Sequence, residues 1–155
     1  MSLESAEAGA ALAVLRAMVT IADATVGRNT EQLTLTQFRA LRVVADRTPV
    51  TVGKVARELA LNPSSVTRAC DRLVTVNLLE KAPNPLNRRE TLLAPTAPGR
   101  RLVDRVDRDR RQVLAAVLGQ LDAEDRAAAV VAFERFAEAV KAYEADFRPL
   151  LRDAT

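Results

Sequence analysis

The sequence predicts a mainly α-helical protein with a small β-wing, in which a winged helix-turn-helix lobe is combined with long helices from both ends of the chain. Apolar residues recur at three- and four-residue steps along most of its length, as in amphipathic helices. Two short runs suited to strands, LLEKA and ETLLA, enclose the loop PNPLNRR and indicate a hairpin. The length of 155 residues fits one domain, which we expect over residues 1–155.

The first two predicted helices each have one apolar face. In the first, over residues 3–27, apolar residues recur from Ala11 to Val26. The second lies within LTLTQFRALRVVADR and stops before Pro49, because the residue preceding a proline disfavours the helical conformation.

The two middle helices have clear end signals. Thr51 is the expected N-cap of TVGKVARELA. In NPSSVTRACDRLVTVN, Asn62 is the expected N-cap, Pro63 suits the first turn, and Asn77 can take the left-handed conformation that ends the helix. The apolar stripe of this fourth helix consists of Val66, Ala69, Cys70 and Leu73.

Two long helices are expected after the hairpin. Thr96 can cap a helix over residues 97–118, and Asp122 with Asp125 resembles the start of a last helix. The last helix has an apolar face that we assign to core or dimer packing, formed by Val130, Phe133, Phe136, Val140, Tyr143 and Phe147.

The positive charge is concentrated in the middle of the chain. The formal net charge is +3, and by residue count it divides into −1 over residues 1–30, +7 over residues 31–111 and −3 over residues 112–155. A basic middle segment fits a polyanionic partner, although helix surfaces rich in arginine are also commonly just solvated.

The composition argues against catalysis and metal binding. The chain has no histidine, the commonest general base and metal ligand, and its 5 glycines form no phosphate-binding loop. We therefore expect no enzyme activity, no catalytic residue, no cofactor and no metal site. The one cysteine, Cys70, lies on an apolar stripe, so a small core residue is favoured over a redox sensor.

The sequence is also expected to lack membrane-targeting segments. No continuous apolar run reaches roughly 18 residues, and the start MSLESAEAGA lacks the features of a signal peptide. We expect a cytoplasmic protein with no membrane partner.

The order of helix, turn, helix and ribbon suits double-stranded DNA. In a winged helix-turn-helix unit, the second helix enters the major groove and the ribbon tip reaches the minor groove. Arg68 could bind guanine through paired donors, and an arginine at the ribbon tip suits a narrow minor groove. Both features also have explanations without DNA. Arg88 and Arg89 could be solvated residues of a loop tip, and the hydroxyls of the fourth helix could be the polar residues that commonly begin a helix.

From Leu35 to about Leu102 the chain resembles the MarR family of bacterial transcription regulators. LTLTQFRALRVV is similar to the family's second helix, and TVGKVARELALNPSSVTRACDRLVTVNLLEK to its helix-turn-helix and first wing strand. NPLNRRETLLAPTAPGRRL is similar to its wing and to the Thr-x-x-Gly entry into its fifth helix. Asn84 and Asn87 stand where the family usually has aspartates, and Asn77 stands where it usually has glycine.

The resemblance implies a homodimeric regulator, most often a repressor, that binds a palindromic operator. It implies a winged helix-turn-helix lobe over about residues 34–96 and dimerisation helices over residues 3–27 and 97–147. It also adds a small-molecule effector to the expected partners, since family members often bind aromatic or anionic compounds. The expected DNA-binding residues are Thr51, Lys54, Asn62, Ser64, Ser65, Thr67, Arg68, Arg72, Arg88 and Arg89.

Two other functions fit the same residues. A winged-helix interaction module could bind an acidic protein through the basic face, and an architectural protein could bind DNA without an effector. Salt-dependent preference for one palindromic duplex over random duplex distinguishes the three.

Overall fold

The structure, a computed structural model, describes residues 3–147 and the side chains of residues 5–143. Residues 1–2 and 148–155 of the expected single domain lie outside the described residues, as does the side chain of Phe147. The elements are, in order, α1 (Leu3–Asn29), α2 (Leu35–Arg47), β1 (Val50–Thr51), α3 (Val52–Leu59), α4 (Pro63–Thr75), β2 (Leu79–Pro83), β3 (Thr91–Pro95), α5 (Ala97–Leu118) and α6 (Ala123–Phe147).

Polar residues begin the helices as the sequence predicts. The side chains of Thr51, Asn62 and Thr96 each accept a hydrogen bond from a backbone N–H in the first turn of α3, α4 and α5. The N-cap of α2 is Thr34, which forms a reciprocal capping box with Gln37. The four helices of the central lobe therefore start where local chemistry fixes them.

The sheet has one more strand than the sequence predicts. The expected ribbon of β2 and β3 is present, with Leu79 opposite Pro95 and Pro83 opposite Thr91. A third strand, β1, pairs antiparallel with β3 and places Val50 opposite Leu93. The expectation of a two-stranded ribbon was incomplete, because a strand of two residues is too short to show alternation.

The core of the lobe lies between α2, α3, α4, the sheet and the first turns of α5. Its side chains are almost completely buried and include no aromatic residue except one phenylalanine. They comprise Phe38, Leu41, Val44, Val55, Val66, Cys70, Leu73, Leu79, Leu93 and Val106. The apolar stripe predicted for α4 is confirmed as part of this core, which forces the polar face of α4 outward.

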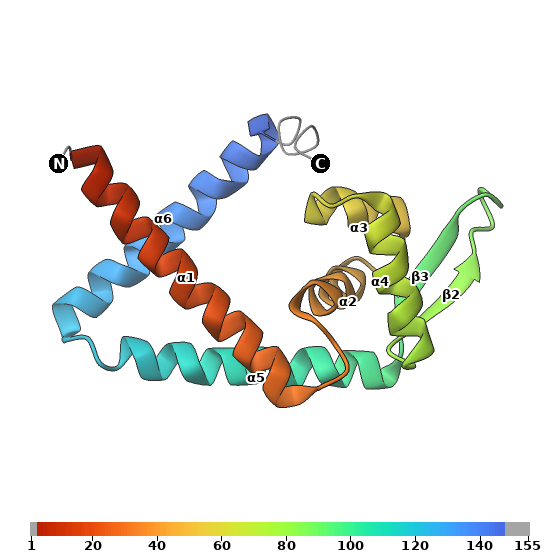
Figure 1. Cartoon of the computed structure of the whole chain (residues 1–155), viewed down its shortest axis with the longest axis horizontal. Helices are drawn as coiled ribbons and strands as arrows, with labels where there is room; N and C mark the ends of the chain where they lie inside the picture. Colours follow the sequence, from red (N-terminus) through yellow and green to blue (C-terminus); the bar gives the residue numbers. More distant parts are fainter. Residues whose placement is uncertain (1–2, 148–155) are drawn as a thin grey trace.

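The long helices extend away from the lobe (Figure 1). Helix α5 begins in the lobe, and the C-terminal part of α1 packs against it, with Thr25 and Val26 buried. Apolar side chains along the rest of α1 and along α6 are exposed in the single chain, among them Leu12, Leu15, Val19, Val131, Phe136 and Tyr143. The exposed part of α1 (the N-terminal arm) and α6 (the C-terminal arm) thus present apolar surface that the described part of this chain does not cover.

The sequence analysis predicts no membrane span, but helix α1 meets the length and composition of one. Its residues Ser5–Asn29 are long and apolar enough, by length and composition, to cross a membrane, although no single uninterrupted apolar run occurs. One such helix near the N-terminus is weak evidence for a membrane span. The packing of its C-terminal end on α5 gives this helix a place in the fold.

A close backbone approach joins the end of α4 to the start of α5. Asn77 ends α4 in the left-handed conformation, with φ of 58°, as the sequence predicts. The Thr96 hydroxyl donates a hydrogen bond to the Asn77 carbonyl at 2.7 Å, and the Thr96 N–H donates to the Leu78 carbonyl at 3.1 Å. A Cβ on Gly99 would lie 2.1 Å from the Leu78 carbonyl oxygen, so a glycine is required there.

We predict that Gly99→Ala destabilises the protein by roughly 1–3 kcal/mol or more, since the added methyl meets backbone that cannot move aside without distorting the wing. Urea denaturation at one fixed protein concentration measures the change. Gly53→Ala is the matched control, because no atom lies within 4 Å of its added Cβ, and a helical Gly→Ala change is expected to stabilise by about 0.5–1 kcal/mol. Equal effects of the two substitutions would contradict the close approach.

Candidate nucleic-acid interface

The exposed face of α4 combines hydroxyls and guanidinium groups. The Asn62 side chain caps the helix by accepting hydrogen bonds from both the N–H and the hydroxyl of Ser64, at 2.9 and 2.8 Å. The Thr67 hydroxyl donates to the Pro63 carbonyl at 2.9 Å. These three polar side chains are exposed, yet each already has a local hydrogen-bond partner.

A second set of α4 side chains has no partner in the described part of the chain. Ser65, Arg68 and Arg72 are exposed, and their side chains form no hydrogen bond or ion pair with described residues. Positions three, four and seven apart lie on one face of a helix, so these groups form a row. A row of one hydroxyl and two cations matches phosphate oxygens and the acceptor atoms of guanine.

The start of α3 holds the two remaining predicted residues of the helix-turn-helix. The Thr51 hydroxyl accepts a hydrogen bond from the Lys54 N–H at 3.3 Å, and the Thr51 side chain is half-buried. The ammonium group of Lys54 is exposed and has no partner among the described residues. Thr51 therefore caps α3, and Lys54 is the residue of this pair whose side chain has no partner in the described part of the chain.

The wing tip is an ordered loop. The Asn84 side-chain oxygen accepts a hydrogen bond from the Leu86 N–H at 3.0 Å, and its amide donates to the Glu90 carboxylate at 3.2 Å. The Asn87 side-chain oxygen accepts from the backbone N–H of Arg89 at 3.2 Å. The two asparagines thus act as acceptors for the loop backbone, and Asn87 orients the Arg89 backbone through its N–H.

Arg88 and Arg89 are exposed, and no described carboxylate pairs with either guanidinium. The wing projects from the lobe at the end of β2 and β3 (Figure 1). The fold therefore places two cations without a described carboxylate partner in the loop between β2 and β3, on the same lobe as α4.

An ion pair that the sequence analysis missed connects the wing to α4. Lys81 on β2 donates to the carboxylate of Asp71 on α4. The two residues are ten positions apart in different elements, so only the packing of β2 beside α4 brings them together. This exposed pair contributes little to stability, and it adds a polar contact to the packing of β2 on α4.

A polar joint, also missed from the sequence, connects α5 with α1 and α2. Arg42 on α2 forms an ion pair with Asp107 on α5. Burial opposes the charge of Arg42, yet its hydrogen bonds to Asp107 and Asp46 leave its pKa raised. The Asn29 amide at the end of α1 donates to Asp109 at 2.8 Å.

Arg110 completes this joint. Its guanidinium lies 5.0 Å from the centre of the Phe38 ring and donates to the buried Thr25 hydroxyl at 3.2 Å. Burial lowers the pKa of Arg110 from its ordinary value. One cation on α5 therefore contacts both the arm, through α1, and the lobe, through α2.

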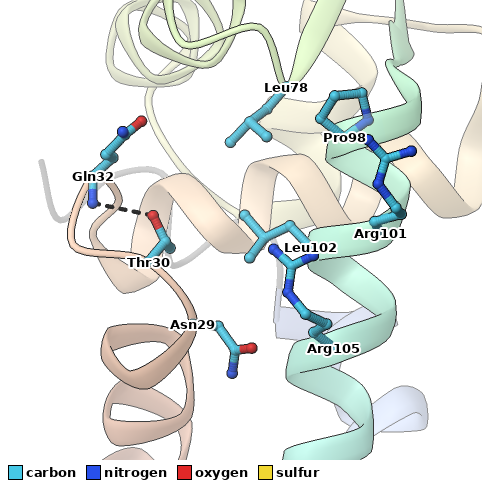
Figure 2. A pocket seen from close by; sticks show the side chains of 8 residues that line it. All are labelled: Asn29, Thr30, Gln32, Leu78, Pro98, Arg101, Leu102 and Arg105. Carbon is cyan, nitrogen blue, oxygen red and sulfur yellow. Dashed lines mark hydrogen bonds between the residues drawn. The ribbon is translucent and has the colours of Figure 1, made fainter.

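A crevice of about 300 Å³ lies beside this joint (Figure 2). Its lining comes from the end of α1, the following loop, the residue before β2 and the first turns of α5. The lining residues are Asn29, Thr30, Gln32, Leu78, Pro98, Arg101, Leu102 and Arg105. Arg101 and Arg105 are exposed and pair with no described carboxylate, so the crevice combines apolar surface with positive charge.

Cys70 is completely buried among the apolar residues of α4. Burial raises the pKa of its thiol from 9.0 to about 11, and the neighbouring Lys81 lowers it only in part. The thiol is therefore protonated at neutral pH. The described residues contain no cluster of three or more His, Cys, Asp or Glu side chains that could hold a metal ion.

The order of elements, the three-stranded wing sheet and the exposed basic helix define a winged helix-turn-helix protein. Residues 31–90 match the family model for the MarR family. The crystal structure of RV1404 from Mycobacterium tuberculosis is 31% identical, has a TM-score of 0.81, and aligns over 91% of this chain and 96% of that one. The chain belongs to the MarR family of transcription regulators.

Relatives found by sequence similarity are also named as transcription regulators. An uncharacterised helix-turn-helix transcriptional regulator from Mycobacterium bovis is 30% identical over 94 residues, which cover 61% of this chain and 66% of the relative. The transcriptional repressor NicR of Pseudomonas putida is 28% identical over 97 residues, 63% of this chain and 61% of the relative. The match thus spans slightly less than two thirds of these relatives, which are named as regulators and not as enzymes.

Two more distant structures share the fold. FabT of Streptococcus pneumoniae, solved in complex with DNA, is 15% identical with a TM-score of 0.76 over 90% of this chain and 99% of that one. MarR of Staphylococcus aureus, solved with salicylate and kanamycin, is 15% identical with a TM-score of 0.75 over 92% and 94% of the two chains.

We predict that Cys70→Ser costs about 1–3 kcal/mol of stability, because a hydroxyl replaces a thiol in apolar surroundings. In the native protein at pH 8 the Cys70 thiol should react with a disulfide reagent at least about 100-fold more slowly than in the unfolded chain, since it is buried and protonated. Folding raises the thiol pKa, so stability should fall as pH rises from 9.0 to about 11. Fast native labelling together with unchanged stability of Cys70→Ser would refute a core role.

Proposed function

We propose that the protein is a homodimeric transcription regulator that binds a palindromic operator and acts as a repressor in the cytoplasm. The observation that supports this proposal most directly is the row of unpartnered side chains on α4, formed by Ser65, Arg68 and Arg72. The helix is rigidly attached through its buried opposite face, so this row is presented in a fixed orientation. A rigid basic helix is what readout of the major groove requires.

The proposed DNA interface joins the recognition helix α4 to the wing. Arg68 and Arg72 would face the major groove, while Arg89 would enter the adjacent minor groove and Arg88 would contact the backbone. The caps and hydroxyls at the starts of α3 and α4 would contact phosphates. These additional contacts come from Thr51, Lys54, Asn62, Ser64, Ser65 and Thr67. The DNA complex of the distantly related FabT supports this use of the fold.

The dimer is proposed to form through the two ends of the chain, residues 3–27 and 97–147, leaving residues 34–96 as the DNA-binding lobe. Large apolar side chains on α1 and α6 are exposed by 36–65% in the single chain, and no other described element packs extensively on α6. Many large apolar side chains exposed on two long helices are typical of an interaction site. A two-fold copy of the same chain would cover both arms and give the two α4 helices the symmetry of a palindrome.

The crevice beside the joint is the proposed effector site. Arg101 and Arg105 supply positive charge beside Leu102, which suits a small aromatic or anionic compound (Figure 2). The salicylate complex of the Staphylococcus aureus MarR supports binding of a small effector, and the name of the transcriptional repressor NicR supports repression. A ligand there would contact α1 and α5 at the point where the arm meets the lobe.

The deciding experiment is selection of bound fragments from random duplex DNA, followed by titration of the selected duplex at several salt concentrations. A recovered palindrome, bound at least about 1000-fold more tightly than random duplex, is the expected result. Binding without sequence preference would indicate an architectural protein instead. An absence of duplex binding, with binding to an acidic protein, would indicate an interaction module.

Within that assay, Arg68→Ala is expected to cost roughly 1–3 kcal/mol on the selected duplex and to relax the preferred base at one position per half-site. The reason is that the Arg68 side chain forms no hydrogen bond or ion pair with the described residues, so its truncation removes the proposed contact to DNA without breaking a described contact within the protein. Arg47→Ala is a control arginine of the same lobe, because its guanidinium is engaged by Glu58. Equal losses on selected and random duplex would assign Arg68 to a phosphate.

The dimer is tested by placing a charge on the arm. Phe136 is 65% exposed in the single chain, and Phe136→Glu should weaken self-association by at least about tenfold, since it removes roughly 1.5–3 kcal/mol of apolar burial. Sedimentation equilibrium over nanomolar to micromolar concentrations measures the shift toward monomer. Leu86→Glu introduces the same charge at the wing tip and should leave the dimer unchanged. A wild-type monomer that binds a palindrome tightly would overturn the dimer proposal.

A further inference from the structure

The wing tip has a feature that the basic residues do not explain. Leu86 is 95% exposed, the highest value of any large apolar side chain among the described residues. Full exposure of a leucine gains nothing for folding, and the side chain contributes nothing to the core beneath the wing. Its position is therefore free to serve contacts outside the chain.

Hydrogen bonds fix the loop conformation in which the Leu86 side chain is exposed. The Leu86 N–H donates to the Asn84 side chain at 3.0 Å, and the next N–H, of Asn87, donates to the Asn84 carbonyl at 3.2 Å. The base of the loop is closed by the Asn84 N–H, which donates to the Glu90 carbonyl at 3.1 Å. The loop therefore holds Leu86 outward in a defined conformation.

The residues next to Leu86 indicate which kind of molecule could contact it. Arg88 and Arg89 follow within three residues, are exposed, and have no carboxylate partner in the described chain. The tip lies at the far end of the β2–β3 ribbon, away from the apolar arms α1 and α6 (Figure 1). A single leucine beside two cations is too small an apolar surface for a protein interface, which needs a larger patch.

The minor groove of DNA presents the complementary chemistry. Its walls are the apolar faces of deoxyribose, its rims are phosphates, and proteins that bind it commonly combine arginines with an apolar side chain. We propose that Leu86 is a further DNA-contacting residue, whose side chain packs against the sugar wall of the minor groove beside the wing arginines. This inference rests on the proposed DNA binding and adds an apolar contact to an interface otherwise made of charges and hydroxyls.

The test compares Leu86→Asn with Leu86→Met on the selected duplex. Leu86→Asn should weaken binding by about fivefold or more, whereas Leu86→Met retains apolar area and should stay within about twofold of wild type. The salt slope should be the same for all three proteins, because no phosphate contact is lost. Arg88→Ala is the contrasting variant, with a salt slope reduced by about one unit.

Hydroxyl-radical footprinting supplies a readout that affinity alone does not. Wild-type protein and Leu86→Met should protect the minor-groove sugars at the outer edges of the site, and Leu86→Asn should lose that protection while the rest of the footprint persists. Thermal unfolding should be unchanged in both variants, since Leu86 has no core contact.

Several outcomes would overturn the inference. Unchanged affinity and sugar protection in Leu86→Asn would show that the leucine is merely solvated, and an equal loss in Leu86→Met would show that an apolar contact is not the cause. If wild-type protein bound no duplex, the proposed function would fall and this inference with it. If wild-type protein bound the duplex but Leu86→Asn changed neither affinity nor sugar protection, only the role of Leu86 would be refuted and the proposed function would stand.

Discussion

Arg110 is the residue at which α5, the lobe and the N-terminal arm meet. Its guanidinium lies over the Phe38 ring of α2 and donates to Thr25 of α1, so one side chain of α5 contacts both the lobe and that arm. The Arg42–Asp107 ion pair and the Asn29–Asp109 hydrogen bond flank this contact. A half-buried guanidinium needs such partners, because desolvation without them would be costly. The joint is therefore specific in geometry.

This joint gives the proposed dimer a physical basis for recognising half-site spacing. If the arms associate around a two-fold axis, the separation of the two α4 helices follows from the angle between arm and lobe, which the joint holds. The crevice lined by Arg101 and Arg105 opens beside the same contacts. A bound anion there would act on the element that sets the angle, with no need for a distant transmission path.

Within the lobe, a second constraint positions the wing. Thr96 and the glycine at position 99 bring the start of α5 against the backbone at Leu78, where α4 passes into β2. The Lys81–Asp71 ion pair then ties the ribbon to α4. Helix α4 and the wing therefore have a fixed relation, so the two grooves that they are proposed to enter must have matching geometry. An ordered tip presenting Leu86 fits this rigid design.

Local chemistry in the sequence determined the helices, their caps, the left-handed Asn77 and the apolar stripe of α4, because each depends on residues within one or two turns. It also singled out the basic residues of α4 and the wing as the candidate site. Only the tertiary structure decided that β1 joins the sheet and that Arg42, Lys81 and Arg110 find distant partners. These features join elements far apart in the chain, and short-range patterns contain no information about which elements pack together.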